Sequence, residues 1–114
     1  MANNAVSIYF SKNEYERVEK ASEYGVLGWN PLMKVLIKNG LEALMKEEKL
    51  VFIFDPNVSL DKEIYKTKVL RLDDKGYAEM KKICACTPFS MSNLAKYIIL
   101  PQVDEAIAKK GWSY

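Results

Sequence analysis

The sequence of 114 residues contains no histidine and only two cysteines. Without histidine, an enzyme lacks its most common general base and a zinc site lacks its most common ligand. Cys84 and Cys86 have no second pair elsewhere, so the chain cannot build a four-ligand metal site. Both are expected to be buried small apolar side chains in a reducing cytoplasm. No nucleophile with a neighbouring base is visible either. We therefore expect a protein that is not an enzyme and holds no metal or cofactor.

Long hydrophobic runs are also absent. The longest, Leu50–Phe54 and Tyr97–Leu100, are far shorter than the roughly 20 residues that cross a bilayer. The first residues show no basic segment followed by an apolar core, the pattern of a signal peptide. We therefore expect a cytoplasmic protein without a membrane partner. The composition, 49% hydrophobic and 28% charged with a net charge of +2, is that of a folded domain and neither demands nor excludes a nucleic-acid partner.

What the sequence does contain is an internal repeat with an offset of 62 residues. Residues 5–45 and 67–107 align without a gap, and their apolar positions coincide along the whole length. Identities are few, so the shared hydrophobic pattern is the stronger signal, and it indicates two copies of one supersecondary unit. The identical pairs are Tyr15 with Tyr77, Lys20 with Lys82, Leu32 with Leu94, and Lys34 with Lys96.

The first copy is predicted to be a strand followed by two helices. Ala5–Phe10 alternates apolar and outward positions, as a half-buried strand does. Ser11 and Glu14 have the spacing of a capping box that opens a helix, and Gly25 is its expected left-handed stop. Asn30 is the predicted cap of the second helix, whose first turn contains Pro31.

The second copy repeats this order with other residues. Thr67–Leu72 is the predicted strand, Asp73 the cap of the next helix, Thr87–Pro88 the break, and Ser92 the cap of the last helix. Each second helix also contains helix-weakening residues, Asn39–Gly40 in the first copy and Leu100–Pro101 in the second. There we expect a kink or a short final turn.

Residues 48–64 join the two copies and contain the apolar run Leu50–Phe54. One interpretation is a strand or a continued helical turn that covers the shared core. The other is an exposed patch for a partner.

A lone strand with two short helices cannot fold by itself, whereas two copies can pair their strands and interlock their helices. This pattern resembles the ribbon-helix-helix family, the Arc and Met repressor superfamily, with both protomers fused in one chain. The resemblance implies a mostly α fold with a two-stranded antiparallel β-ribbon, in which units 5–47 and 65–110 form one intertwined pseudo-dimeric domain joined by linker 48–64.

In that family the ribbon enters the major groove of double-stranded DNA, and its outward side chains touch base edges. Carried over by position, Arg71 is the best candidate for a guanine contact and Val69 for a thymine methyl contact. The triplet Ala5, Ser7 and Tyr9 is poorer in hydrogen-bonding groups than is usual in the family. The implied base-reading residues are Ala5, Ser7, Tyr9, Thr67, Val69 and Arg71.

The family also holds phosphates at the start of its second helix, where free backbone amides and the helix dipole favour an anion. Lys68 falls on the inward side of its strand, near the ribbon's end, where it could extend to solvent or phosphate. The implied phosphate-binding residues are Trp29, Asn30, Lys34, Lys66, Lys68, Met91, Ser92 and Lys96.

For the DNA binding that the resemblance implies, the charge distribution predicts an asymmetric protein. Residues 5–47 are neutral overall, residues 48–65 carry −2 and residues 66–114 carry +4, so the second half is expected to supply more of the affinity. The leading hypothesis is a sequence-specific transcriptional repressor associated with the nucleoid. The alternatives are a relaxosome accessory protein of a mobile plasmid and a protein-interaction module that kept the fold and lost DNA binding. Either a monomeric pseudo-dimer or a further homodimer on DNA fits the fusion.

Overall fold

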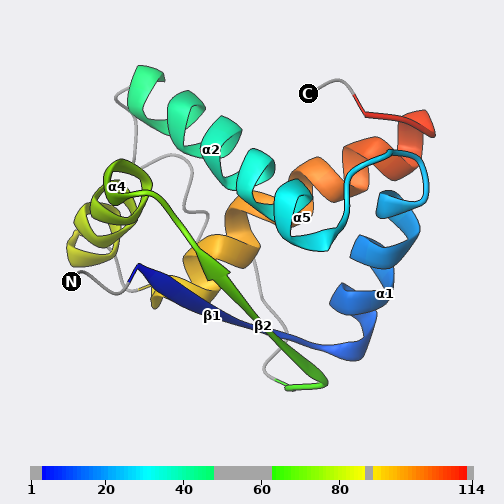
Figure 1. The fold of residues 1–114 in the computed structure, drawn as a ribbon, viewed down its shortest axis with the longest axis horizontal. Helices are drawn as coiled ribbons and strands as arrows, with labels where there is room; N and C mark the ends of the chain where they lie inside the picture. The colour runs from blue at the N-terminus through cyan, green and yellow to red at the C-terminus, as the bar shows by residue number, and fades with distance from the viewer. Residues whose placement is uncertain (1–3, 48–62, 87–88, 113–114) are drawn as a thin grey trace.

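Two strands that are distant in the sequence form the only sheet in the part of the chain that the structure describes. The computed structural model describes residues 4–47, 63–86 and 89–112. The strand β1 (Ala5–Phe10) pairs antiparallel with β2 (Lys66–Arg71). Four helices complete the described elements, in the order β-α-α-β-α-α (Figure 1). They are α1 (Lys12–Ser22), α2 (Trp29–Glu47), α4 (Asp74–Ala85) and α5 (Met91–Lys109).

The strand register shows that the two copies are related by a pseudo-twofold axis. Ser7 pairs with Val69, and these two residues are equivalent under the offset of 62. A residue pairs with its own equivalent only where a twofold axis passes between the strands. On either side of this axis, the pair of Ala5 with Arg71 corresponds to the pair of Tyr9 with Thr67. The register therefore confirms the alignment of the repeat.

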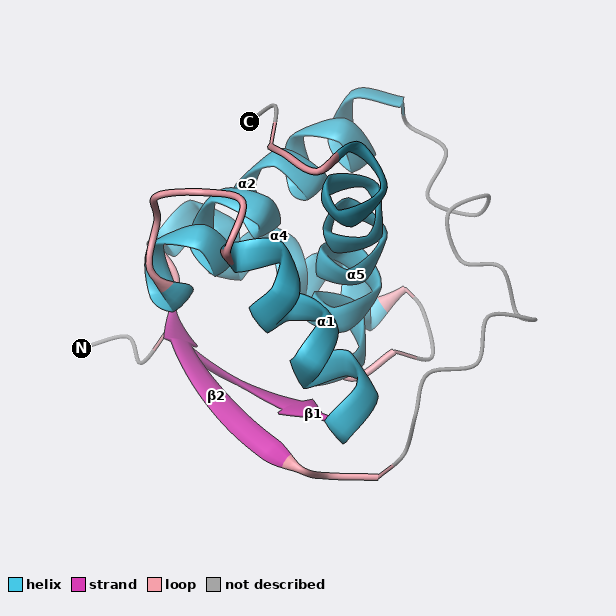
Figure 2. Cartoon of the chain, turned by 90° about the vertical axis from the view of Figure 1, so that its right-hand side faces the viewer, coloured by secondary structure: helices cyan, strands magenta, loops and turns pink. Residues whose placement is uncertain are grey.

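One face of the ribbon is buried against the helices and the other faces outward. Val6, Ile8, Phe10 and Leu70 are almost completely buried, in agreement with the alternation in the sequence. Figure 2 shows the ribbon lying on one side of the helical layer. The fold is thus mostly helical with a two-stranded antiparallel ribbon, as predicted.

The helices of the two copies interlock. β1 and α1 both pack on α5 of the other copy, while β2 and α4 pack on α2. Each copy therefore buries its apolar residues largely against the other, which explains why neither could keep a core alone. The fully buried side chains with the largest volumes are Phe10, Ile8, Leu32, Met33, Leu36, Ile37, Leu41, Leu70, Met80, Ile83, Leu94 and Ile99.

Two helix starts agree with the sequence. The Glu14 amide donates to the Ser11 hydroxyl at 3.2 Å, and the Ser11 amide donates to the Glu14 carboxylate at 2.8 Å, which completes the capping box. The carboxylate of Asp73 accepts from the Gly76 amide at 2.7 Å at the start of α4.

Three other predicted helix boundaries were wrong. Ser90, not Ser92, caps α5, and its hydroxyl accepts from the Asn93 amide at 3.1 Å. Helix α2 begins at Trp29, so Asn30 lies inside its first turn rather than at its cap. No described glycine has a positive φ, so Gly25 is not a left-handed stop. Instead α1 ends through tight backbone bonds, including one of 3.2 Å from the Gly25 amide to the Ser22 carbonyl.

Neither long helix ends at its weak point, contrary to the expected short final turn. Helix α2 continues past Gly40 to Glu47, and α5 contains Pro101 well inside its length. At Gly40 an added Cβ would collide with Ile98, so glycine permits the close approach of α2 and α5. The side-chain amide of Gln102, the repeat equivalent of Gly40, donates to the carbonyls of Leu36 at 2.8 Å and Ile98 at 2.9 Å. At both helix-weakening positions, Gly40 in α2 and Pro101 in α5, contacts between α2 and α5 therefore lie at or next to the weak residue.

Two sequence expectations lie outside the described residues. These are the conformation of Leu50–Phe54 and the break at Thr87–Pro88. Among the residues that are described, no helix combines the length and the hydropathy that a bilayer crossing requires.

Candidate nucleic-acid interface

The outer face of the ribbon brings all six predicted base-reading residues together. Directly paired residues of antiparallel strands point to the same side of the sheet. The three outward pairs are Ala5 with Arg71, Ser7 with Val69, and Tyr9 with Thr67. Tyr9 is 42% exposed and Val69 53% exposed, and Thr67 and Arg71 are exposed as well. We call these six residues the outer row.

The chemistry of the outer row is uneven along the ribbon. The centre holds a small hydroxyl, Ser7, beside the apolar side chain of Val69. The long polar side chains, Tyr9 and Arg71, lie at positions related by the pseudo-twofold axis and so at opposite ends of the row. A guanidinium can donate two hydrogen bonds to one planar acceptor, whereas a tyrosine hydroxyl makes single bonds. The two ends therefore differ in what they can recognise.

Behind the ribbon, Trp29 and Lys68 belong to a cluster of aromatic rings and a cation. The Trp29 ring stacks on Tyr15 with a centroid distance of 5.0 Å and meets the Phe10 ring edge-on at 5.9 Å. The Lys68 ammonium lies 4.9 Å from the centre of the Trp29 ring and 5.7 Å from that of Tyr15. Burial, and then the neighbouring Glu19 carboxylate, raises the pKa of Tyr15, so its ring stays neutral beneath the cation. Both Trp29 and Lys68 thus have partners inside the protein.

The start of α5 holds β1 in place. Ser92 is only 7% exposed, and its hydroxyl accepts from the Tyr9 amide at 3.0 Å. Met91 is half-buried, with its sulfur 3.5 Å from the sulfur of Cys84. Burial raises the pKa of the Cys84 thiol, whereas Cys86 is exposed, so the expectation that both cysteines are buried was wrong for Cys86. Ser92 therefore fixes β1 on α5, whereas Met91 contacts α4.

Lys96 requires a correction, because its ammonium is in the core. The residue is 2% exposed, and its Nζ lies 3.0 Å from the Glu14 carboxylate, which is equally buried. A cation that is removed from solvent and paired in this way cannot reach a phosphate without breaking the pair. Its repeat equivalent Lys34 is exposed on α2, as are Asn30 at the start of that helix and Lys66 at the end of the ribbon.

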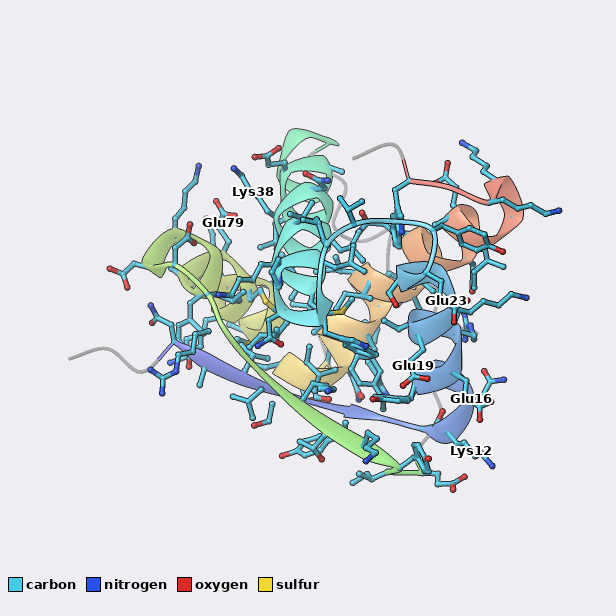
Figure 3. The ribbon with its side chains drawn as sticks, turned by 45° about the vertical axis from the view of Figure 1, so that its right-hand side comes forward. Lys12, Glu16, Glu19, Glu23, Lys38 and Glu79 are labelled. Carbon is cyan, nitrogen blue, oxygen red and sulfur yellow. The ribbon has the colours of Figure 1, made fainter. Side chains whose placement is uncertain are left out.

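The outer helices differ in their exposed charges. Helix α1 exposes Lys12, Glu16, Glu19 and Lys20, and Glu23 follows its last residue; the labelled side chains of Lys12, Glu16, Glu19 and Glu23 point away from the core (Figure 3). Helix α4 exposes one carboxylate, Asp74, and three lysines, which are Lys75, Lys81 and Lys82. The exposed charges of α1 therefore balance, whereas α4 exposes more cations than carboxylates, in the same direction as the segment charges.

Reasoning from the sequence missed two contacts that shape this region, the helix cap at Ser90 and the buried ion pair of Glu14 with Lys96. The cap Ser90 had a signal, since Phe89 before it and Leu94 after it have the spacing of a hydrophobic staple. The pair of Glu14 with Lys96 had none, because the two residues are distant in the chain and meet only through the interlocking of α1 and α5.

Comparison with models of known families, with curated protein sequences and with solved structures gives no match to this chain. The fold itself is consistent with two ribbon-helix-helix units in tandem, since a β-α-α order occurs twice and the two strands pair antiparallel. Within the described part of the chain, no group of three or more cysteine, aspartate or glutamate side chains is placed to hold a metal ion.

Proposed function

We propose that this protein belongs to the Arc and Met repressor superfamily and binds double-stranded DNA by inserting its ribbon into the major groove, as a sequence-specific transcriptional repressor. The observation that carries the proposal is the outer row, in which six side chains of two paired strands face away from the helices. A two-stranded ribbon fits the width of the major groove. The helices beneath it hold the row in one orientation, which limits the entropy lost on binding.

Within this proposal, the residues of the outer row divide the work of recognition. Arg71 donates two hydrogen bonds to a guanine, and Val69 contacts a thymine methyl group. Tyr9 and Thr67 offer hydroxyls to base edges or to the sugar-phosphate backbone. Ala5 and Ser7 let the groove floor approach the ribbon closely.

Phosphate binding falls to the exposed groups around the ribbon. Asn30 and Lys34 lie at the start of α2 and Lys66 at the ribbon's end, and all three are exposed. The backbone at the start of α5 supplies a second anion-binding position through the helix dipole. The lysines of α4 add positive charge to the second half, so we expect that half to bind phosphates more strongly.

Because the two strands are unequal, the preferred site should be asymmetric. The twofold-related positions Tyr9 and Arg71 cannot read the same base in the same way. Selection of bound fragments from a random duplex library should therefore return a non-palindromic site. Recovery of no enriched sequence would contradict specific recognition.

The decisive variant is Arg71→Ala, compared with Lys81→Ala on α4. Loss of a bidentate contact to guanine costs about 1–3 kcal/mol of discrimination, so Arg71→Ala should bind selected and scrambled duplexes with similar affinity. Lys81→Ala removes one charge away from the ribbon and should keep the preference. Fluorescence anisotropy at several salt concentrations measures both effects. An affinity indifferent to salt and to Arg71 would overturn the proposal.

Two alternative functions use the same fold but differ from a repressor in the partner or the DNA site that the ribbon contacts. A relaxosome accessory protein would use the same contact, but its selected site would lie beside a plasmid transfer origin rather than a promoter. A protein-interaction module is favoured by the few hydrogen-bonding groups of Ala5 and Ser7, and it would give no salt-dependent DNA binding. Solution mass with and without the selected duplex separates a monomeric pseudo-dimer from a homodimer on DNA.

A further inference from the structure

The pseudo-twofold axis relates two helix interfaces that differ sharply in their polar contacts. Between α1 and α5, Glu14 pairs with Lys96 at 3.0 Å, and the Arg17 guanidinium pairs with Asp104, one of its bonds being 3.0 Å. The equivalent interface lies between α4 and α2. There Gly76 takes the position of Glu14, while Lys34 keeps the position of Lys96. This second interface therefore retains the cation and lacks the carboxylate.

A cavity of about 500 Å³ lies at this second interface. Lys34 and Gly76 both line it, and the buried side chains of Ile37 and Leu41 contribute apolar surface. Its volume lies within the range of small-molecule sites, which are mostly apolar with a few directed polar groups. Among the described residues, no hydrogen bond or ion pair engages Lys34.

The charges around the cavity indicate where an anion would go. The equivalents of Arg17 and Asp104 are Glu79 and Glu42, so two carboxylates replace an ion pair. Figure 3 shows Glu79 on α4 and Lys38 on α2 projecting into the space between these helices, and both line the cavity. Glu42 and Glu79 therefore cannot form the ion pair that joins α1 to α5 in the other interface. The end near Gly76 also holds the Asp73 carboxylate, which accepts from the Gly76 amide at 2.7 Å. An anion there is favoured by Lys34 together with Arg71 and Lys75, which line the same cavity and outnumber this carboxylate.

We infer that this cavity binds a small organic carboxylate with an apolar body. Its carboxylate takes the place that the Glu14 side chain fills in the other interface, and it pairs with Lys34. Its apolar body lies on Ile37 and Leu41. The charged side chains that line the cavity comprise four cations and three carboxylates, so one bound monoanion balances them. The cations are Lys34, Lys38, Arg71 and Lys75, and the carboxylates are Glu42, Asp73 and Glu79.

Isothermal titration calorimetry without DNA tests the inference directly. The probes are octanoate and phenylacetate, each compared with its neutral amide of nearly the same shape. Because a charge-assisted bond to the ammonium is available only to the acids, they should bind about tenfold or more tightly than octanamide and phenylacetamide. Equal affinities of acid and amide, or the absence of saturable binding by both acids, would overturn the inference.

Two variants locate the binding. Lys34→Gln should abolish the preference for acid over amide, while Lys20→Gln, which removes the same charge from the exposed face of α1, should keep it. The double variant Asp73→Ser with Gly76→Glu rebuilds the capping box of the other copy, because Ser11 and Glu14 are the equivalents of these two positions. Replacing Asp73 also removes the carboxylate that a Cβ at position 76 would approach at 2.9 Å.

The double variant should carry its own carboxylate into the cavity, so it should lose acid binding and melt at a higher temperature than the natural protein. Retained acid binding in the folded double variant, or equal behaviour of Lys34→Gln and Lys20→Gln, would refute the site. Arg71 also lines the cavity. A bound acid should therefore shift affinity for DNA, and this last effect alone rests on the proposed function. Because the calorimetry is done without DNA, a failure of acid binding can be distinguished from a failure of the proposed DNA binding.

Discussion

Replacing Lys96 by methionine should destabilise the folded chain by about 3–5 kcal/mol, because it leaves the Glu14 carboxylate buried without its cation. Both residues are 2% exposed, so water cannot replace the lost partner. The carboxylate would keep its bond of 2.8 Å from the Ser11 amide, which satisfies only part of its hydrogen-bonding capacity. A domain of this size is typically stable by about 5–15 kcal/mol, so the loss would be a large share of the total.

Urea unfolding followed by circular dichroism measures this effect, provided that the m-value stays constant. The matched control is Lys34→Met, the same substitution at the equivalent position of the other copy, where the side chain is exposed and has no acidic partner among the described residues. We expect the control to change stability by less than about 0.5 kcal/mol. The double variant Glu14→Gln with Lys96→Met should recover much of the loss, because it removes the isolated charge and keeps an amide in the capping box.

The reasoning would be refuted if Lys96→Met cost no more than Lys34→Met. It would also fail if the double variant were less stable than Lys96→Met alone, since the cost would then come from lost packing rather than from an uncompensated charge.

Three further predictions concern packing, capping and thiol chemistry. Gly40→Ala should lower stability by about 1–3 kcal/mol despite the higher helix propensity of alanine, because the new methyl group collides with Ile98. Thermal melting measures this loss of stability. A raised melting temperature would show that α2 and α5 can move apart at no cost. Ser90→Ala should cost about 0.5–2 kcal/mol through loss of the cap, and an unchanged urea midpoint would contradict the assignment of the cap. Burial raises the pKa of Cys84, so near pH 8 it should react more slowly with iodoacetamide than the exposed Cys86, as peptide mass mapping would show, and the difference should narrow as pH rises. Equal rates at both sites would contradict the burial of Cys84.

Much of the architecture could be read from periodic patterns. The alternation of Ala5–Phe10 and the capping box at Ser11 are local signals, because strand faces and helix caps depend on neighbours a few residues apart. Helix ends were less predictable. Ser90 and Ser92 are both good caps in isolation. The staple spacing of Phe89 and Leu94 favours Ser90, and the packing of the ribbon on α5 uses the Ser92 hydroxyl as the acceptor for the Tyr9 amide.

The candidate interface was predictable only in part, because local patterns show which face of a strand is outward but not which distant residues pack together. The outer row follows from strand alternation, and all six of its members share one face. The predicted phosphate contacts divide between the surface and the interior. Trp29, Lys68 and Lys96 meet partners from the other copy or from elsewhere in the chain, and no local pattern records such contacts.

The repeat, the type of each element and the outward face of the ribbon follow from the sequence alone, because all of these depend on the period of apolar residues along the chain. The differences between the two copies depend on tertiary contacts. Lys34 and Lys96 are identical in type and equivalent in position, yet one is exposed and the other is buried against Glu14. The residue across the interface makes the difference, a glutamate in one case and Gly76 in the other. Such partners are set by the interlocking of the helices, which brings together residues from opposite ends of the chain.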